Sequence, residues 1–105
     1  MYKYSIKEWL VNDRPREKFI QKGCEYLSDT ELLAILIRSG TQDRSALVVA
    51  QEVLRLADDN LSLLAKLKIK DLLTIKGIGN TKAITLMTAL ELGRRRRVSE
   101  AADRS

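Results

Sequence analysis

Apolar residues recur along most of the chain at the three- and four-residue spacing of an α-helix, and strictly alternating stretches are rare. The most apolar run, 32–37, follows Ser28-x-x-Glu31, a pair that can cap a helix N-terminus reciprocally. We expect a helix from Asp29 to about Arg38 that is apolar nearly all round and therefore central. The pattern predicts an all-α chain that forms a compact bundle of five or six helices.

The N-terminal part is predicted to consist of an arm and one helix. Residues 1–14 are interpreted as an extended arm. Pro15 then opens a helix at the position where its missing N–H costs nothing, and Gly23 ends it. Phe19 and Ile20 are expected to face inward from this helix.

The remaining helices follow the apolar central run. A turn at 39–44 separates that run from a helix that is capped by Asp43 or Ser45 and ends near Ala57. Three more helices are predicted: a short one at 61–65, another at 69–74 and a longer one at 82–97.

Two glycines lie one residue apart in Gly77-Ile78-Gly79, between the last two predicted helices. Two helices joined by a tight Gly-x-Gly bend are typical of a helix–hairpin–helix. Glycine adopts positive φ without a Cβ clash and allows another backbone to approach closely. Amides at the N-terminus of the second helix, with the positive end of its dipole behind them, favour an anion such as phosphate.

A weaker copy of this pattern precedes the hairpin. The segment 32–46 parallels 72–83, since both place two leucines and an isoleucine before a glycine and an alanine. The first copy has inserted residues and one glycine fewer. The similarity is either chance among leucine-rich helices or a tandem helix–hairpin–helix, with the first copy degenerate and the second competent. We adopt the tandem arrangement as our prediction.

Charge is unevenly distributed along the 105 residues, whose net charge is +5. Residues 1–60 hold nine Lys and Arg against ten Asp and Glu, whereas residues 61–105 hold ten against four. The basic excess thus accompanies the Gly-x-Gly hairpin, which favours a polyanionic partner. The alternative is a surface that is charged only for solubility.

The hairpin and nearby basic residues form the predicted phosphate-binding site. Its primary residues are Lys76, Gly77, Ile78, Gly79, Asn80, Thr81 and Lys82. Secondary basic contacts are expected from Lys66, Lys68, Lys70, Arg94 and Arg95. Such donors read the sugar–phosphate backbone, so we expect binding to be sequence-independent and weakened by salt. The arginine run 94–97 has a second interpretation, a helix end favoured by the dipole.

The composition excludes several kinds of chemistry. There is no histidine for a catalytic triad or a metal site, and a single cysteine, Cys24, cannot form an internal disulfide. Cys24 is expected to be a half-buried structural residue. We predict no metal, no cofactor and no catalysis by these 105 residues. No apolar run is long enough to cross a membrane, so we expect a soluble, cytoplasmic protein.

Four blocks of the chain together resemble the N-terminal half of the RadC family of bacterial proteins. They are residues 13–18 (Asp-Arg-Pro-Arg-Glu-Lys), 27–41 (Leu-Ser-Asp-x-Glu-Leu-Leu-Ala-Ile-Leu-Ile-Arg-Ser-Gly-Thr), 75–83 (Ile-Lys-Gly-Ile-Gly-x-x-Lys-Ala) and 89–95 (Ala-Leu-Glu-Leu-Gly-Arg-Arg). The similarity extends over about residues 6–97. Many DNA-repair proteins share the third block, whereas the first two are more specific to RadC.

The resemblance implies a longer bacterial protein associated with DNA repair. RadC proteins carry a second, JAB/MPN metalloprotease-like domain with a His-x-His and Asp zinc motif, so the full-length protein would be a zinc hydrolase. None of those catalytic positions exists in this chain. The residues that carry over are those of the hairpin, as non-specific DNA contacts: Lys76, Gly77, Gly79 and Lys82.

The sequence therefore predicts a DNA-binding module at 15–97, preceded by the arm 1–14 and followed by a linker at 98–105. The linker would lead to the absent metal domain, with which intramolecular contact is expected. The alternative is a protein-interaction or dimerisation module that docks the absent domain, with residues such as Leu92 in the contact. We expect a monomer or a weak homodimer.

Overall fold

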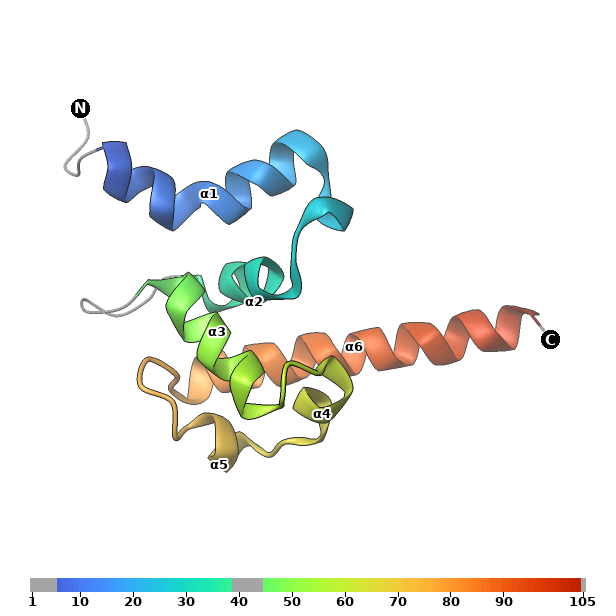
Figure 1. The fold of residues 1–105 in the computed structure, drawn as a ribbon. Helices are drawn as coiled ribbons and strands as arrows, with labels where there is room; N and C mark the ends of the chain where they lie inside the picture. Colours follow the sequence, from blue (N-terminus) through green and yellow to red (C-terminus); the bar gives the residue numbers. More distant parts are fainter. Residues whose placement is uncertain (1–5, 39–44, 105) are drawn as a thin grey trace.

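The computed structural model describes residues 6–38 and 45–104, and every regular element in these ranges is helical (Figure 1). The described part thus confirms the predicted all-α class with six α-helices. The predicted turn at 39–44, with Gly40 and the alternative cap Asp43, lies outside the described residues. The elements are α1 (Ile6–Lys22), the 3-10 helix η1 (Cys24–Tyr26), α2 (Asp29–Ile37), α3 (Ala46–Leu56), α4 (Leu61–Lys66), α5 (Ile69–Leu72) and α6 (Asn80–Arg104).

The N-terminal helix differs from the prediction at its start. α1 is continuous from Ile6, so residues 6–14 are not extended and Pro15 lies inside the helix. A proline there removes one helical hydrogen bond. Its ring is buried beside Ala34 and Ala46, where it lines a hollow of only about 10 Å³. Packing against α2 and α3 therefore offsets the lost hydrogen bond.

The expectation that Phe19 and Ile20 face inward is also wrong, since they are 43% and 83% exposed. Lys18 pairs with Glu31 of α2, so the face of α1 that meets α2 contains Pro15 and Lys18. At about 100° per residue, Ile20 lies about 140° around the helix axis from Pro15. Gly23 does end the helix as predicted, with φ of 99° and its N–H bonded to the carbonyl of Phe19.

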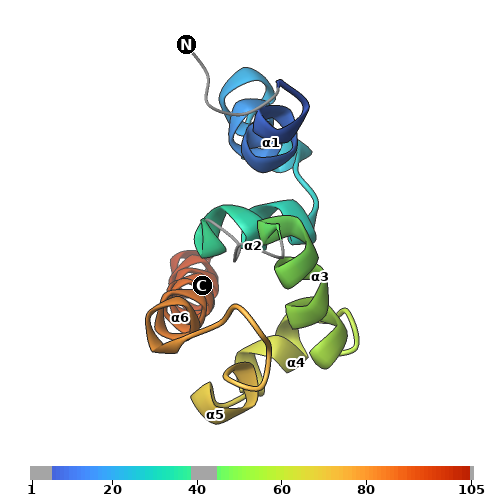
Figure 2. The same ribbon diagram turned by 90° about the vertical axis from the view of Figure 1, so that its left-hand side faces the viewer.

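α2 is the central helix, as its apolar run predicts. The Ser28 Oγ accepts from the Glu31 N–H at 3.1 Å, and the Glu31 carboxylate accepts from the Ser28 N–H at 2.9 Å. Ser28 is the N-cap of this capping box, and the helix begins at the next residue, Asp29, which confirms the prediction. α2 contacts α1, α3 and α6, and Figure 2 shows α1 as an outer layer above it.

One contiguous core joins α2 to α6. Leu64, Leu72 and Leu86, which are fully buried, bring α4, α5 and α6 together beneath α2 and α3. Burial of each such side chain contributes about 1.5–3 kcal/mol.

Ser45, one of the two predicted caps, caps the N-terminus of α3. Cys24, however, is exposed on η1 rather than half-buried.

The last helix is longer than predicted. α6 runs to Arg104, so residues 98–104 are helical and do not form an irregular tail. Its 25 residues span about 37 Å, and its C-terminal half projects beyond the bundle (Figure 1). Ion pairs from Glu91 to Arg95 and from Arg96 to Glu100 join successive turns along the projection. Such pairs and good helix formers allow a helix to continue without tertiary packing.

The capping box predicts an acid-dependent stability. The Ser28 N–H, and then Lys18, hold the pKa of Glu31 below its ordinary value of 4.5. A lowered pKa stabilises the fold above pH 4.5, and this contribution is lost as the pH falls through the lowered value. Glutamine keeps an acceptor for the Ser28 N–H but loses the charge that Ser28 and Lys18 stabilise, so we expect Glu31→Gln to lower the free energy of unfolding at pH 7 by about 1 kcal/mol and to flatten its decrease towards pH 3.

Urea denaturation between pH 3 and pH 7 measures this effect. Glu25→Gln, which removes an exposed carboxylate from η1, is the matched control. Equal pH dependence in Glu31→Gln and the unmodified chain would contradict the stabilising role of the Glu31 charge.

Candidate nucleic-acid interface

The loop between α5 and α6 is held in place from inside by two isoleucines. Ile75 and Ile78 are only 9% and 6% exposed and belong to the core. The Ile78 N–H also donates to the Ile75 carbonyl at 3.1 Å, which closes a tight turn between them. The residues next to these two anchors, Lys76 and Gly79, are exposed.

The two glycines of the hairpin have different roles. Gly77 has φ of 103°, in the left-handed region that a residue with a Cβ rarely adopts. Gly79 does not have this conformation, and a Cβ built on it would meet nothing within 4 Å. The fold therefore requires a glycine at 77 to form the turn, whereas its own packing does not require one at 79.

The loop leads directly into the N-terminus of α6. The Gly79 carbonyl accepts from the Ala83 N–H at 3.0 Å, which makes Gly79 the N-cap. Asn80 and Thr81 are exposed in the first turn, where a helix offers its N–H groups no acceptor of its own. Ala83 is fully buried and fixes this turn against the core.

The structure brings the seven primary residues of the predicted site into one surface loop and helix start. Lys76, Gly79, Asn80 and Thr81 are exposed, and Gly77 and Lys82 are half-buried. Only Ile78 is buried, so its side chain supports the loop and cannot face a ligand. α5, predicted at 69–74, is a single turn that ends at Leu72.

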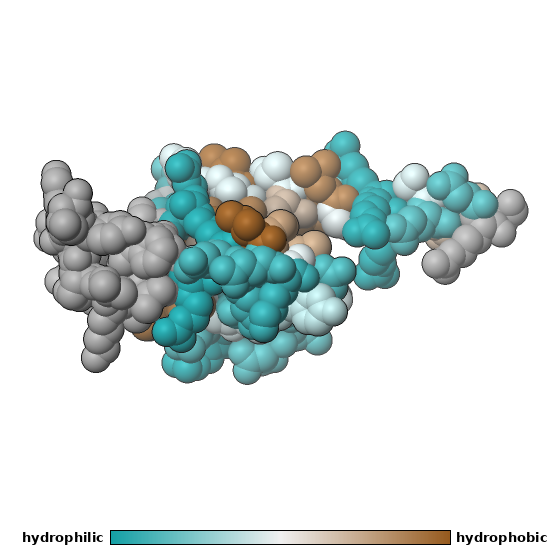
Figure 3. Space-filling model, turned by 90° about the horizontal axis from the view of Figure 1, so that it is seen from above, coloured by the Kyte–Doolittle hydropathy of each residue, from teal (hydrophilic) through white to brown (hydrophobic). Residues whose placement is uncertain are grey.

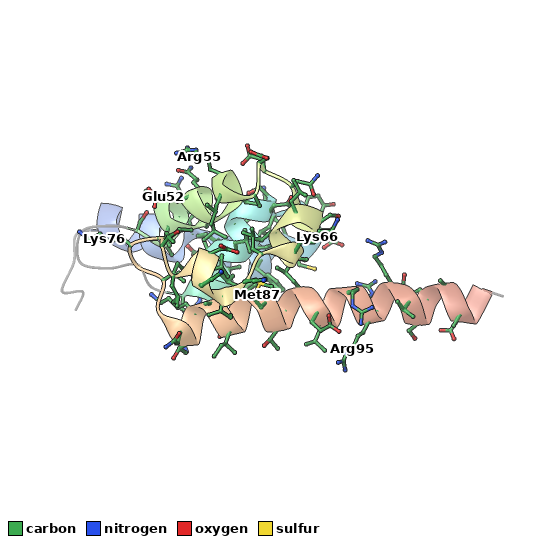
Figure 4. The ribbon with its side chains drawn as sticks, turned by 90° about the horizontal axis from the view of Figure 1, so that it is seen from below. Glu52, Arg55, Lys66, Lys76, Met87 and Arg95 are labelled. Atoms are coloured by element: carbon green, nitrogen blue, oxygen red, sulfur yellow. The ribbon has the colours of Figure 1, made fainter. Side chains whose placement is uncertain are left out.

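Two of the secondary basic residues, Lys66 and Arg95, lie away from the hairpin (Figure 4). Lys68 and Lys70 are exposed on or next to α5. In Figure 4, Lys76 and Lys66 lie at opposite ends of the bundle, and Arg95 points away from it on the projecting half of α6. The structure thus separates a hairpin surface from a second basic region around α4 and α6.

Three arginines of α6, Arg94, Arg95 and Arg96, are paired with carboxylates of their own helix. Arg94 donates to both carboxylate oxygens of Glu91, at 3.0 and 2.8 Å, and Arg95 donates to one of them at 2.8 Å. Hydrogen bonds from Arg94 and then Arg95 lower the pKa of Glu91 to about 2. Because α6 continues past Arg97, the interpretation of the run as a helix end is wrong.

A shallow hollow that no sequence pattern indicates adjoins the hairpin. It has a volume of about 550 Å³ and lies between α3 and the loop. Glu52 and Arg55 of α3 line it together with Lys76, and Figure 4 shows all three on the same side of the bundle. No local pattern marks Arg55, since only the packing of α3 brings it beside residues much later in the chain.

Two other features are absent from the described residues. No group of three or more His, Cys, Asp and Glu side chains in residues 6–38 and 45–104 could hold a metal ion. Within the same residues, no helix combines the length and the apolarity that crossing a membrane requires.

The fold and the loop define a small all-α domain that presents a glycine turn and a helix N-terminus at its surface. The family model described as UPF0758 N-terminal matches residues 6–84. The chain therefore belongs to the UPF0758 family, and this N-terminal region is the part for which the sequence resembles RadC. No solved structure matches the chain.

The relatives are bacterial proteins that bear the same family name. A UPF0758 protein of Flavobacterium johnsoniae is 47% identical over 97 residues, which are 92% of this chain and 42% of the relative. One of Geobacillus thermodenitrificans is 46% identical over 101 residues, covering 91% and 44%. One of Porphyromonas gingivalis is 48% identical over 92 residues, covering 87% and 40%. The chain thus spans about two fifths of the length of these curated relatives.

Because Gly77 and Gly79 have different roles, the same substitution should affect stability differently at the two positions. Gly77→Ser should lower the free energy of unfolding by about 1 kcal/mol or more, because serine is strained at positive φ. Gly79→Ser should change it by less than about 0.5 kcal/mol, since serine is a favourable N-cap and its Cβ has room. Urea denaturation measures both, and equal losses would contradict this account of the loop.

Proposed function

We propose that this chain is a sequence-independent DNA-binding module whose hairpin, Lys76 to Lys82, holds a backbone phosphate. The observation that carries the proposal is Gly79, a glycine that the internal packing does not require. It lies at the N-cap of a long helix, on the exposed surface. A missing side chain there lets a phosphate reach the amides of the first turn.

The surrounding charge supports a polyanion at this position. Lys76 and Lys82 flank the amides, and residues 61–105 hold ten basic against four acidic residues. The positive end of the α6 dipole adds to their field. Lysines and backbone amides recognise phosphate rather than base edges, so the binding would be independent of sequence. With about three to five phosphate contacts, affinity would be roughly micromolar or weaker at physiological salt.

The tandem helix–hairpin–helix arrangement is part of the same proposal. α2 packs on α3 as α5 packs on α6, and both pairs share one core. In this arrangement the first pair supports the second, which carries the phosphate site. Within the longer relatives, the module would hold a RadC-like protein on DNA while a JAB/MPN-type metal domain supplied the hydrolytic chemistry.

A second candidate function is protein docking, favoured by exposed apolar residues on the outer helices. Ile20 of α1 and Leu92 of α6 are 83% and 63% exposed. Viewed from above, the molecule has apolar surface near its middle and mainly hydrophilic surface towards the end of α6 (Figure 3). Contact with a further domain, or a weak homodimer, would cover such residues.

The DNA proposal predicts a charge effect at position 79. Asp and Asn are both favourable N-caps, so Gly79→Asp and Gly79→Asn should fold as stably as the unmodified chain. The aspartate also places a negative charge where the phosphate would sit. We expect Gly79→Asp to weaken DNA binding at least about fivefold relative to Gly79→Asn.

Fluorescence anisotropy with a labelled 20-base-pair duplex at two salt concentrations measures this difference. The affinity of the unmodified chain should fall steeply with salt, with a log–log slope of about −2.7 to −4.5. Affinity that is independent of salt, or equal affinity of the two variants, would contradict the proposal.

A further inference from the structure

A second groove lies between α4 and the middle of α6, with a volume of about 720 Å³. Its apolar lining includes Leu61 of α4 and Met87 and Leu90 of α6. Met87 and Leu90 pack against the core but remain half-exposed, and Leu61 is exposed. The groove therefore offers an apolar surface that the described part of the chain leaves uncovered.

Gly93 lines this groove at a position where the helix itself does not favour a glycine. It lies well inside α6, where glycine costs about 1 kcal/mol relative to alanine. A Cβ built on it would meet nothing within 4 Å. Neither the backbone nor the packing of the described residues requires glycine here, and its absent side chain keeps that part of the groove open.

Three cations line the same groove: Lys66, Arg94 and Arg97. Arg94 is held by Glu91, the carboxylate among the lining residues. Among the described residues, neither Lys66 nor Arg97 has a carboxylate partner. The lining thus combines an apolar floor with uncompensated positive charge.

This combination distinguishes between two kinds of occupant. Single-stranded nucleic acid binds through aromatic side chains that stack on its bases, and the described residues that line the groove include no aromatic residue. An amphipathic helix instead places apolar residues in a groove and its polar residues along the edges. Carboxylates on that helix would complement Lys66 and Arg97.

We propose that the α4–α6 groove docks an acidic amphipathic helix of a protein partner. The apolar stripe of the partner would lie over Met87 and Leu90, its backbone would approach Gly93, and its carboxylates would meet Lys66 and Arg97. This docking does not depend on DNA binding, because Lys66 and the hairpin residue Lys76 lie at opposite ends of the bundle (Figure 4).

NMR titration of the ¹⁵N-labelled chain with a synthetic peptide tests the proposal. The probe is a helical peptide with leucines at three- and four-residue spacing and glutamates on both sides of the stripe. Amides of Ala65, Met87 and Gly93 should shift saturably, while those of the hairpin should not. A peptide with lysine at every glutamate position should bind at least about tenfold more weakly.

Two variants separate the groove from a general charge effect. Gly93→Gln fills the open part of the groove with a better helix former and should weaken peptide binding about tenfold. Lys66→Gln combined with Arg97→Gln should weaken it about fivefold. The matched control, Lys22→Gln combined with Arg38→Gln, removes two exposed cations outside the groove and should have no effect.

Three results would overturn the proposal. The first is an absence of groove shifts at a peptide concentration of about 1 mM, and the second is equal binding of the lysine peptide. The third is a larger response of the groove amides to single-stranded DNA than to the acidic peptide, which would make the groove a nucleic-acid surface. Loss of DNA binding at the hairpin would leave all three results unaffected.

Discussion

The structure depends on the burial of Ile75 and Ile78 on either side of a turn that only glycine forms without strain. Because both side chains enter the core, the backbone between them must reverse direction at the surface, and Gly77 allows this at φ of 103°. The same anchors fix where α6 begins. Lys76, Gly79 and the first helical amides are not part of this apolar packing. They lie at the surface because Ile75 and Ile78 occupy the core on either side of the turn.

The parts of the fold that could be predicted are those whose stabilising interactions lie within a short segment of the sequence. Ser28 and Glu31 satisfy each other's backbone groups three residues apart, so the start of α2 could be predicted. Pro15 could not, because its ring is accommodated by Ala34 and Ala46, which come much later in the chain. The helical conformation past Val98 is supported by the ion pair between Arg96 and Glu100, whereas the polar composition of this segment is equally typical of a linker.

The candidate site shows the same division between local and tertiary causes. The Gly-x-Gly motif located the hairpin, but the distinct roles of Gly77 and Gly79 required the backbone conformation and the space around each residue. Closeness in sequence places the basic residues in one predicted site. The structure instead separates Lys66 from Lys76 and adds Arg55 from α3 beside the hairpin. Together with the groove beside Gly93, this suggests two independent surfaces on one small domain of the UPF0758 family.

The central claim is that the hairpin, rather than the arginines of α6, is the phosphate-binding surface. A titration of the ¹⁵N-labelled chain with a short DNA duplex at low salt, followed by NMR, tests it most directly. The largest saturable shifts should occur at residues 76–82. Shifts that are largest at residues 94–97, or no saturable shift at residues 76–82, would contradict it.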